Sequence, residues 1–412
     1  MRNALSCRFC GSLLEHTFVD LGASPLANSY LTEEQLNKME PFYPLKAYVC
    51  GSCFLVQLPA YESPENIFGE YAYFSSYSDS WLAHGRDYTE MVLERYPVGI
   101  GALVMEIASN DGYLLRYFQA RGINVQGVEP AKNVAEAARK AGIPTLVEFF
   151  GADLANRLVN EGKKADLLIG NNVLAHVPGL NDFVSGMKTV LAPSGIITME
   201  FPHLMRLIDE NQFDTIYHEH FSYFSLITVE KVFANQGLVL FDVEELPTHG
   251  GSLRIYARNA EDPSKPVSAK VKDLMNRERA YGLKDLGFYR SYGSRVKEKK
   301  RDILEFLIRL KREGKTIAGY GAPAKGNTLL NYCGIRTDFI EYTVDRNPHK
   351  QGCFLPGSQI PILSPEKVRE TCPDYLLILP WNLKDEIMGQ MDHIREWGGR
   401  FAVLIPEVEV FP

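Results

Sequence analysis

The feature that most constrains this chain is a set of four cysteines in two Cys-x-x-Cys pairs, Cys7-Arg-Phe-Cys10 and Cys50-Gly-Ser-Cys53. Pairs with this spacing can place four thiolates around one tetrahedral zinc ion. The loop between them, residues 11–49, is longer than in ordinary zinc ribbons, and two disulfides or four unrelated thiols are the alternatives. Since no open coordination position is evident, the pattern predicts a structural zinc ion with these four cysteines as its ligands.

A zinc module of this size accounts for only the front of the chain, because 412 residues are enough for two or three domains. The net charge of −7 leaves no basic stripe for phosphates, which argues against a nucleic-acid partner. No apolar run is long enough for a membrane span, so we expect no membrane partner. No signal peptide precedes Cys7, and the three remaining cysteines form no pairs. We therefore expect a protein of the reducing cytoplasm.

The rest of the chain alternates short apolar runs with helical patterns, which predicts an α/β fold with mostly parallel, doubly wound sheets. Apolar runs begin near residue 102 and again at residue 316, so we expect two Rossmann-like domains after the zinc module. The predicted domains are residues 1–67, 68–247 and 248–412. Within them we expect helices at 113–120, at 133–141 with Asn133 as N-cap, and in the polar region 266–313, together with strands at 253–257 and 340–345.

A turn at the end of the first strand of the central domain, Glu106-Ile-Ala-Ser-Asn-Asp-Gly112, lies where a doubly wound sheet binds its ligand. Glu129 ends the next strand, where a carboxylate can accept hydrogen bonds from two ribose hydroxyls. The turn lacks the Gly-x-Gly-x-x-Gly of dinucleotide enzymes, and a ligand with a ribose, an amino-acid group and a positive centre fits better. S-adenosylmethionine meets this description, and a turn without ligand is the alternative. The predicted cofactor contacts are Glu106, Ala108, Asn110, Gly112, Tyr113, Glu129, Asn171 and Asn172.

The segment Tyr217-His218-Glu219-His220 combines two histidines with a carboxylate and is a candidate for acid–base chemistry. Histidine can remove a proton near neutral pH, and a carboxylate can orient it. His176 follows another strand at its carboxyl end and should face the same crevice. The alternatives are a catalytic metal held by the two histidines and a purely structural turn.

Three further segments are candidates for substrate contacts. Gly319-Tyr-Gly-Ala-Pro-Ala-Lys-Gly-Asn327 follows a strand and opens a helix, so its backbone N–H groups and Lys325 could hold a phosphate. The glycine turn at 248–254 offers an arginine for an anion, although a plain hairpin turn is as good an interpretation. The aromatic and serine-rich stretch 69–81 is either a pocket wall or a packed linker. The predicted substrate contacts are Tyr77, His249, Gly250, Ser252, Arg254, Lys325 and Asn327.

Over essentially its whole length the chain resembles the three-domain, S-adenosylmethionine-dependent C-methyltransferases of bacterial deoxysugar and antibiotic biosynthesis. The resemblance is greatest to the C-3′-methyltransferases. It rests on the paired cysteines and on the order of the segments 106–112, 217–220, 248–254 and 319–327. It implies a central class I methyltransferase domain and a C-terminal domain that binds a nucleotide sugar.

The resemblance further implies that the substrate is a dTDP-linked 4-keto-deoxysugar. A base would remove the C-3 proton next to the ketone, and the resulting enolate would take the methyl group. By position in the motif His220 would be this base, Glu219 and Tyr217 would support it, and His176 and Tyr71 would line the pocket. The alternatives are C-5 methylation, an NAD-dependent nucleotide-sugar oxidoreductase and a zinc-ribbon nucleic-acid adaptor. A monomer is one option for the oligomeric state, which the sequence leaves open.

Overall fold

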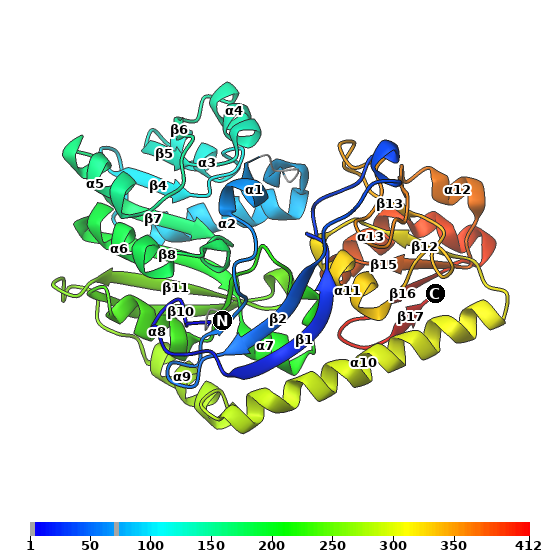
Figure 1. Cartoon of the computed structure of the whole chain (residues 1–412). Coiled ribbons are helices and arrows are strands. Elements are labelled where there is room, and N and C mark those ends of the chain that lie inside the picture. The colour runs from blue at the N-terminus through cyan, green and yellow to red at the C-terminus, as the bar shows by residue number, and fades with distance from the viewer. Residues whose placement is uncertain (1–4, 70–73) are drawn as a thin grey trace.

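The structure is a computed structural model that describes residues 5–69 and 74–412. Three β-sheets organise these residues (Figure 1). A long helix, α10 (Leu286–Arg312), runs from the central part of the molecule to the C-terminal part. None of the described helices combines the length and the apolar composition that crossing a bilayer requires.

The first sheet belongs to the N-terminal module but borrows its last strand from the central domain. Its order is β1-β2-β3-β9, with β1 at His16–Ser24, β2 at Tyr43–Val49, β3 at Val56–Gln57 and β9 at Ser222–Tyr223. Strand β9 pairs antiparallel with β3 directly after the candidate base segment. Strands β1 and β2 lie between the central and C-terminal domains (Figure 1). The N-terminal module is therefore built into the body of the molecule.

The second sheet forms the central domain and has seven strands in the order β10-β11-β8-β7-β4-β5-β6. The five strands β4 to β8 are parallel and confirm the predicted doubly wound arrangement. Their bounds are β4 Leu103–Ile107, β5 Asn124–Val128, β6 Thr145–Leu146, β7 Ala165–Asn171 and β8 Leu191–Pro202. Successive residues of β7 point to opposite faces, so Leu167 and Ile169 join one hydrophobic core and Leu168 joins another.

Helices cover both faces of this sheet, and each face has its own core. The core that contains Leu167 packs against α2 (Asp79–Arg95), α3 (Leu115–Gln119) and α4 (Lys132–Lys140). The opposite core packs against α5 (Ala152–Asn160), α6 (Leu180–Val190) and α8 (Leu226–Ala234). Burial on both sides explains why these strands read as continuous apolar runs in the sequence.

Strand β11 (Ser252–Asn259) follows the predicted boundary between the second and third domains but pairs within the central sheet. We expected it after a boundary at 247/248, but it pairs antiparallel with both β10 (Leu238–Leu246) and β8. The turn between β10 and β11 is short, and consecutive antiparallel strands joined by a short turn stay neighbours. The central sheet therefore extends to Asn259.

Two further expectations about helices change. The predicted cap at Asn133 is wrong, because α4 begins at Lys132 with Ala131 in the cap position and no side-chain cap bond. The polar helical region splits into α9 (Ala269–Tyr281) and α10. Gly282 ends α9 in the left-handed region (φ 109°), and the side chain of Asp285 caps α10 by accepting the Gly287 N–H.

The third sheet forms the C-terminal domain in the order β14-β13-β12-β15-β16-β17. All its strands are parallel except the edge strand β17. Its strands are β12 Ile317–Tyr320, β13 Thr343–Val344, β14 Ile362–Leu363, β15 Tyr375–Ile378, β16 Arg400–Val403 and β17 Glu409–Phe411. Its helices are α11 Ala324–Cys333, α12 Lys367–Thr371 and α13 Lys384–Gln390. The predicted second α/β domain is therefore present. The strand expected at 340–345 is shorter than predicted and spans only the two residues of β13.

Candidate active site

The four N-terminal cysteines form one cluster. Their sulfur atoms all lie within 4.8 Å of one another, and all four are free of disulfides. The Cys7–Cys53 and Cys10–Cys50 sulfur pairs are 3.6 and 3.5 Å apart. Four thiolates at about 2.3 Å from one tetrahedral zinc ion would stand about 3.8 Å apart, so the donor set fits zinc.

The cysteine cluster lies against the outside of the central domain. The Cys53 carbonyl accepts a hydrogen bond from the Thr228 hydroxyl at 3.5 Å, and the Arg8 guanidinium donates to the Pro178 carbonyl at 3.2 Å. Neither contact involves the candidate base. This placement agrees with a structural zinc ion that joins the N-terminal module to the central domain.

The predicted cofactor turn follows β4 and has the backbone that a close ligand requires. Ala108, Asn110 and Gly112 have φ values of 56°, 50° and 77°, in the left-handed region. A Cβ on Gly112 would lie 2.8 Å from Ile143, so the turn has room for glycine alone. Glu129 accepts the Asn110 N–H at 3.0 Å, which ties the end of β5 to this turn.

Several buried polar atoms around this turn have no hydrogen-bond partner among the described residues. They are the hydroxyl of Ser109, Oδ1 of Asp111 and Oδ1 of Asn172. Burial, followed by the nearby carboxylates of Asp111 and Glu129, raises the pKa of Glu106 well above its usual value. Such atoms are costly unless a polar ligand satisfies them. A sulfonium ligand with an amino-acid group and a ribose, as in S-adenosylmethionine, fits this donor and acceptor set.

The next strand end, β7, connects the cofactor turn to the glycine turn at 248–254. The Asn171 amide donates to the Tyr113 hydroxyl at 3.2 Å. Asn172, with φ 54°, places its amide nitrogen 3.0 Å from Nε2 of His249. The end of β7 therefore brings predicted cofactor contacts next to a predicted substrate contact. The cofactor contacts are Tyr113, Asn171 and Asn172, and the substrate contact is His249.

The serine-rich stretch before α2 covers the cofactor turn. The Ser75 N–H donates to Asn110 Oδ1 at 2.9 Å, and the Ser76 N–H donates to Asp111 Oδ2 at 3.1 Å. We did not predict these two serines as site residues, and the hydroxyl-rich composition was the only signal for them. Tyr77, a predicted substrate contact, is 57% exposed. Tyr71 lies outside the described residues.

The candidate base His220 is held in one tautomer by its neighbours. Its Nδ1 lies 2.9 Å from the Thr215 carbonyl, which can only accept, so Nδ1 carries the proton. Nε2 therefore has the free electron pair and accepts the Tyr217 hydroxyl at 2.8 Å. Burial is the largest cause that holds the pKa of His220 well below its usual value of 6.5, and the nearby His176 adds to it. The imidazole is therefore neutral at physiological pH.

His176 and Glu219 lie on either side of this base. The ring centroids of His176 and His220 are 4.7 Å apart, and burial lowers the pKa of His176 to about 4. Both carboxylate oxygens of Glu219 accept from the Asn28 amide, at 2.7 and 2.8 Å. Burial raises the pKa of Glu219 to about 7, although the Asn28 hydrogen bond and the charge of Lys350 lower it. Asn28 and Lys350 come from the other two domains, and no local sequence signal identified them.

His218 faces away from this group. Its Nε2 lies 3.2 Å from the Pro44 carbonyl in the N-terminal module. The structure thus brings His220, Glu219, Tyr217 and His176 together and assigns His218 to a domain contact. The alternative of a metal held by His218 and His220 has no support, because the described residues contain only the cysteine cluster as a candidate metal site.

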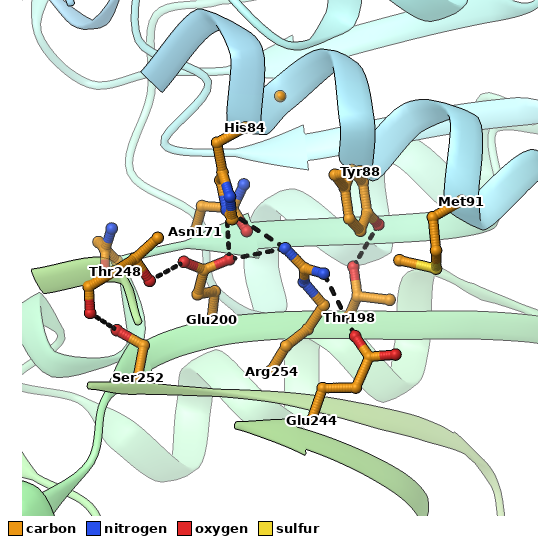
Figure 2. Close-up of polar contacts among 12 residues, drawn as sticks. His84, Tyr88, Met91, Asn171, Thr198, Glu200, Glu244, Thr248, Ser252 and Arg254 are labelled. Carbon is orange, nitrogen blue, oxygen red and sulfur yellow. Dashed lines mark hydrogen bonds and ion pairs between the residues drawn. The ribbon is translucent and has the colours of Figure 1, made fainter. Parts of the chain in front are cut away.

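Arg254, a predicted substrate contact, is paired with acids inside the molecule. Figure 2 shows that its guanidinium is taken up by the buried carboxylate of Glu200, at 3.0 Å, and by Glu244, at 3.3 Å. Glu200 also contacts His84 at 2.9 Å and accepts the Thr248 hydroxyl at 2.8 Å. Although burial raises the pKa of Glu200, His84 and Arg254 lower it to about 2. Arg254 is therefore no free cation for a substrate anion, because two internal acids neutralise it.

The other predicted substrate contacts divide into two groups. Ser252 donates its hydroxyl to the Thr248 carbonyl at 2.9 Å, and Asn327 donates its amide to the Ala27 carbonyl at 2.5 Å, so both are buried in internal contacts. The second group lies where the central and C-terminal domains meet and consists of His249, Gly250 and Lys325. Gly250 has φ 87° and packs so closely on Trp381 that a Cβ would overlap the indole ring.

Family models match three consecutive parts of the chain. They are a zinc binding domain at residues 7–68, a methyltransferase domain at 99–243 and a C-methyltransferase C-terminal domain at 247–406. Among curated proteins, C-methyltransferase NovU of Streptomyces niveus is 38% identical over 404 residues, which is 98% of this chain and 96% of NovU. The ubiquinone biosynthesis O-methyltransferase of Bartonella tribocorum is 25% identical over 134 residues, which is 31% of this chain and 54% of that protein.

The chain also resembles part of a solved methyltransferase structure. Magnesium protoporphyrin IX methyltransferase of Synechocystis PCC 6803, solved with bound S-adenosylmethionine, covers 44% of this chain and 82% of its own at 17% identity, with a TM-score of 0.33. A TM-score this low is too weak to support an inference.

Removal of zinc should loosen the N-terminal module. We expect Cys50→Ser to lose its zinc equivalent and to lower the midpoint of thermal unfolding by roughly 5 °C or more, because the thiolate cluster would lose its cross-link. Metal analysis and differential scanning calorimetry measure both effects. The control is Cys353→Ser, outside the cluster, which should keep zinc and midpoint. An unchanged midpoint in zinc-free Cys50→Ser would contradict a structural role.

The raised pKa of Glu219 predicts a pH-dependent stability difference. Glu219 ionises near 4.5 when exposed and near 7 in the fold, so its contribution to stability is complete below pH 4.5 and is lost as pH rises through 7. Glutamine cannot ionise. Wild type should therefore lose stability relative to Glu219→Gln between pH 4.5 and 7.5, by on the order of 3 kcal/mol. Thermal unfolding across this range measures the difference, with the exposed Glu298→Gln as control. A flat difference for Glu219→Gln would refute the assignment.

Proposed function

The chain belongs to the S-adenosylmethionine-dependent C-methyltransferase family, and we propose that it methylates C-3 of a dTDP-linked 4-keto-deoxysugar. The cofactor supplies an electrophilic methyl group. The chain must therefore turn a carbon of the substrate into a nucleophile, and a carbon next to a ketone is suitable because its anion is an enolate. The sugar class rests on the resemblance described above. Family membership leaves the alternative of an NAD-dependent oxidoreductase without support.

The observation that supports this proposal most is the tautomer of His220. The Thr215 carbonyl fixes the proton on Nδ1, so Nε2 is a neutral base that points at the Tyr217 hydroxyl. A neutral base is needed to remove a proton from carbon, and burial keeps His220 in this form at neutral pH. In the proposed reaction the C-3 hydrogen replaces the Tyr217 hydroxyl at Nε2, which frees this hydroxyl to donate to the ketone oxygen.

His176 and Glu219 complete this arrangement. His176 stacks edge-on to His220 and holds the ring against rotation. Glu219 fixes the backbone of the base segment through Asn28. A ketone at C-4 acidifies C-5 as well as C-3, so C-5 methylation is the second candidate and differs only in which carbon faces Nε2.

Loss of the imidazole should stop the reaction without loss of the cofactor site. We expect His220→Asn to lower the methyl-transfer rate by about 10²-fold to 10⁴-fold, the usual contribution of a general base. Its affinity for S-adenosylmethionine, measured by titration calorimetry, should stay within about twofold, because the cofactor contacts lie on other strands.

The matched control is His218→Asn, the same substitution two residues away on a side chain that faces Pro44. It should keep most of the activity. Near-normal turnover in His220→Asn would exclude His220 as the base.

A further inference from the structure

The C-terminal domain brings one face of helix α11 against the base segment. The Thr328 hydroxyl on this helix donates to the Ile216 carbonyl at 3.1 Å, immediately before Tyr217. Lys325 precedes Thr328 by three residues and so lies on the same face of the helix, one turn closer to its start. Lys325 therefore points toward the segment that carries the base.

The neighbours of Lys325 fix its ammonium group between two parts of the candidate site. Nζ donates to Asn382 Oδ1 at 2.6 Å and lies 4.7 Å from the centre of the Trp381 ring. The Trp381 indole N–H donates to Asp214 Oδ2 at 2.7 Å, three residues before Tyr217. The same ring packs on Gly250, next to His249. The ammonium group thus lies over a ring that contacts both Asp214 and the glycine turn.

No carboxylate of the described residues contacts Lys325 directly, although the charge of Asp214 acts on it. No carboxylate lies within 4.0 Å of its Nζ in the described part of the chain, and its hydrogen-bond partner is the neutral amide of Asn382. Lys350 of the same domain, by contrast, has Asp345 at 3.7 Å. An ammonium group has three donors, so Lys325 keeps donor capacity and charge for a ligand. Its partial burial strengthens any such interaction.

The positive charge of Lys325 also acts on two histidines of the candidate site. It is among the causes, after burial, that lower the pKa values of His220 and His249. Asp214, the nearby acid, does not neutralise it by contact and already accepts the Trp381 indole N–H. A cation this close to a neutral base favours an anion that forms beside that base.

We propose that Lys325 donates a hydrogen bond to the carbonyl oxygen of the substrate and stabilises the negative charge that develops there. This rests on the proposed function. His220 Nε2 takes the proton from the carbon next to the carbonyl group. The electron pair of that C–H bond becomes the C=C bond of the enolate, and the carbonyl π pair moves to oxygen, beside the Lys325 ammonium group. When the enolate carbon attacks the methyl group, the methyl C–S bond breaks and its electron pair stays on sulfur, which leaves as the neutral thioether S-adenosylhomocysteine. The C=O bond re-forms in the same step.

This role differs from the phosphate contact that the glycine-rich sequence suggested for Lys325. The carbonyl oxygen is two bonds from the carbon that loses its proton, whereas the diphosphate is attached across the sugar ring. A group beside the base therefore meets the carbonyl oxygen. The C-terminal domain would then complete the catalytic site as well as bind the nucleotide.

Proton exchange separates the two roles without any contribution from methyl transfer. The full-length protein is incubated in D₂O with a dTDP-linked 4-keto-deoxyhexose and no S-adenosylmethionine, and loss of the proton next to the ketone is followed by ¹H NMR. Lys325→Met should lower the saturated exchange rate by about 10²-fold to 10³-fold, the usual cost of one lost oxyanion donor. Lys325→Arg should retain part of it. The affinity for dTDP alone, from titration calorimetry, should stay within about threefold.

Three controls make the result decisive. Lys367→Met, which changes a half-buried lysine of the same domain, should behave as wild type. The affinity for S-adenosylmethionine checks the fold of each variant, and Lys325→Gln replaces Lys325→Met if the latter fails this check. His220→Asn sets the rate expected without the base.

Two outcomes would overturn the inference. In the first, Lys325→Met keeps the exchange rate at saturation and weakens dTDP binding tenfold, which assigns the lysine to the diphosphate. In the second, exchange and binding both stay at wild-type values. If wild type neither exchanges the proton nor methylates the sugar, the proposed function itself is wrong, which a failure of Lys325 alone would not produce.

Discussion

The geometry of the site depends on one short segment, residues 213–220, which hydrogen bonds from all three domains hold in place. The N-terminal module contributes Asn28, whose amide binds both oxygens of Glu219. The C-terminal domain contributes Trp381, whose indole N–H binds Asp214. The central domain carries the segment and continues it into β9, which completes the N-terminal sheet. The orientation of the base is therefore a property of the assembled chain.

Burial of this segment and its surroundings also explains why the titratable groups of the site differ in their pKa shifts. Burial keeps His220 neutral and raises the pKa of Glu219 to about 7, while Glu200 stays ionised because His84 and Arg254 face it. Groups whose environments push their pKa values apart can divide the roles of base, donor and fixed charge among themselves. In this division Glu200 holds His84, Thr248 and Arg254 together, and Lys325 is a cation that no carboxylate of the described residues contacts directly.

Sequence reasoning was most informative where the signal is local. The two cysteine pairs were predicted from spacing alone, and their four sulfur atoms form one cluster. The turn at 106–112 and the tyrosine–histidine–glutamate–histidine segment are also local signals, and their proposed chemistry follows from residue type and spacing. Sequence reasoning failed for residues whose contact partner is distant in the chain. Arg254 looked like a free cation because Glu200 lies 54 residues away, and Asn28 gave no signal because Glu219 lies 191 residues away. The antiparallel return of β11 also depends on a sheet that no local pattern reveals.

The central claim is that His220 creates a nucleophilic carbon next to a sugar ketone. It is tested most directly by supplying a panel of dTDP-linked 4-keto sugars with ¹³C-methyl-labelled S-adenosylmethionine and locating the new methyl group by NMR. We predict a methyl group bonded to carbon, at C-3, on a sugar that keeps its ketone. A methyl group on oxygen or nitrogen, or transfer to none of these sugars, would contradict this account.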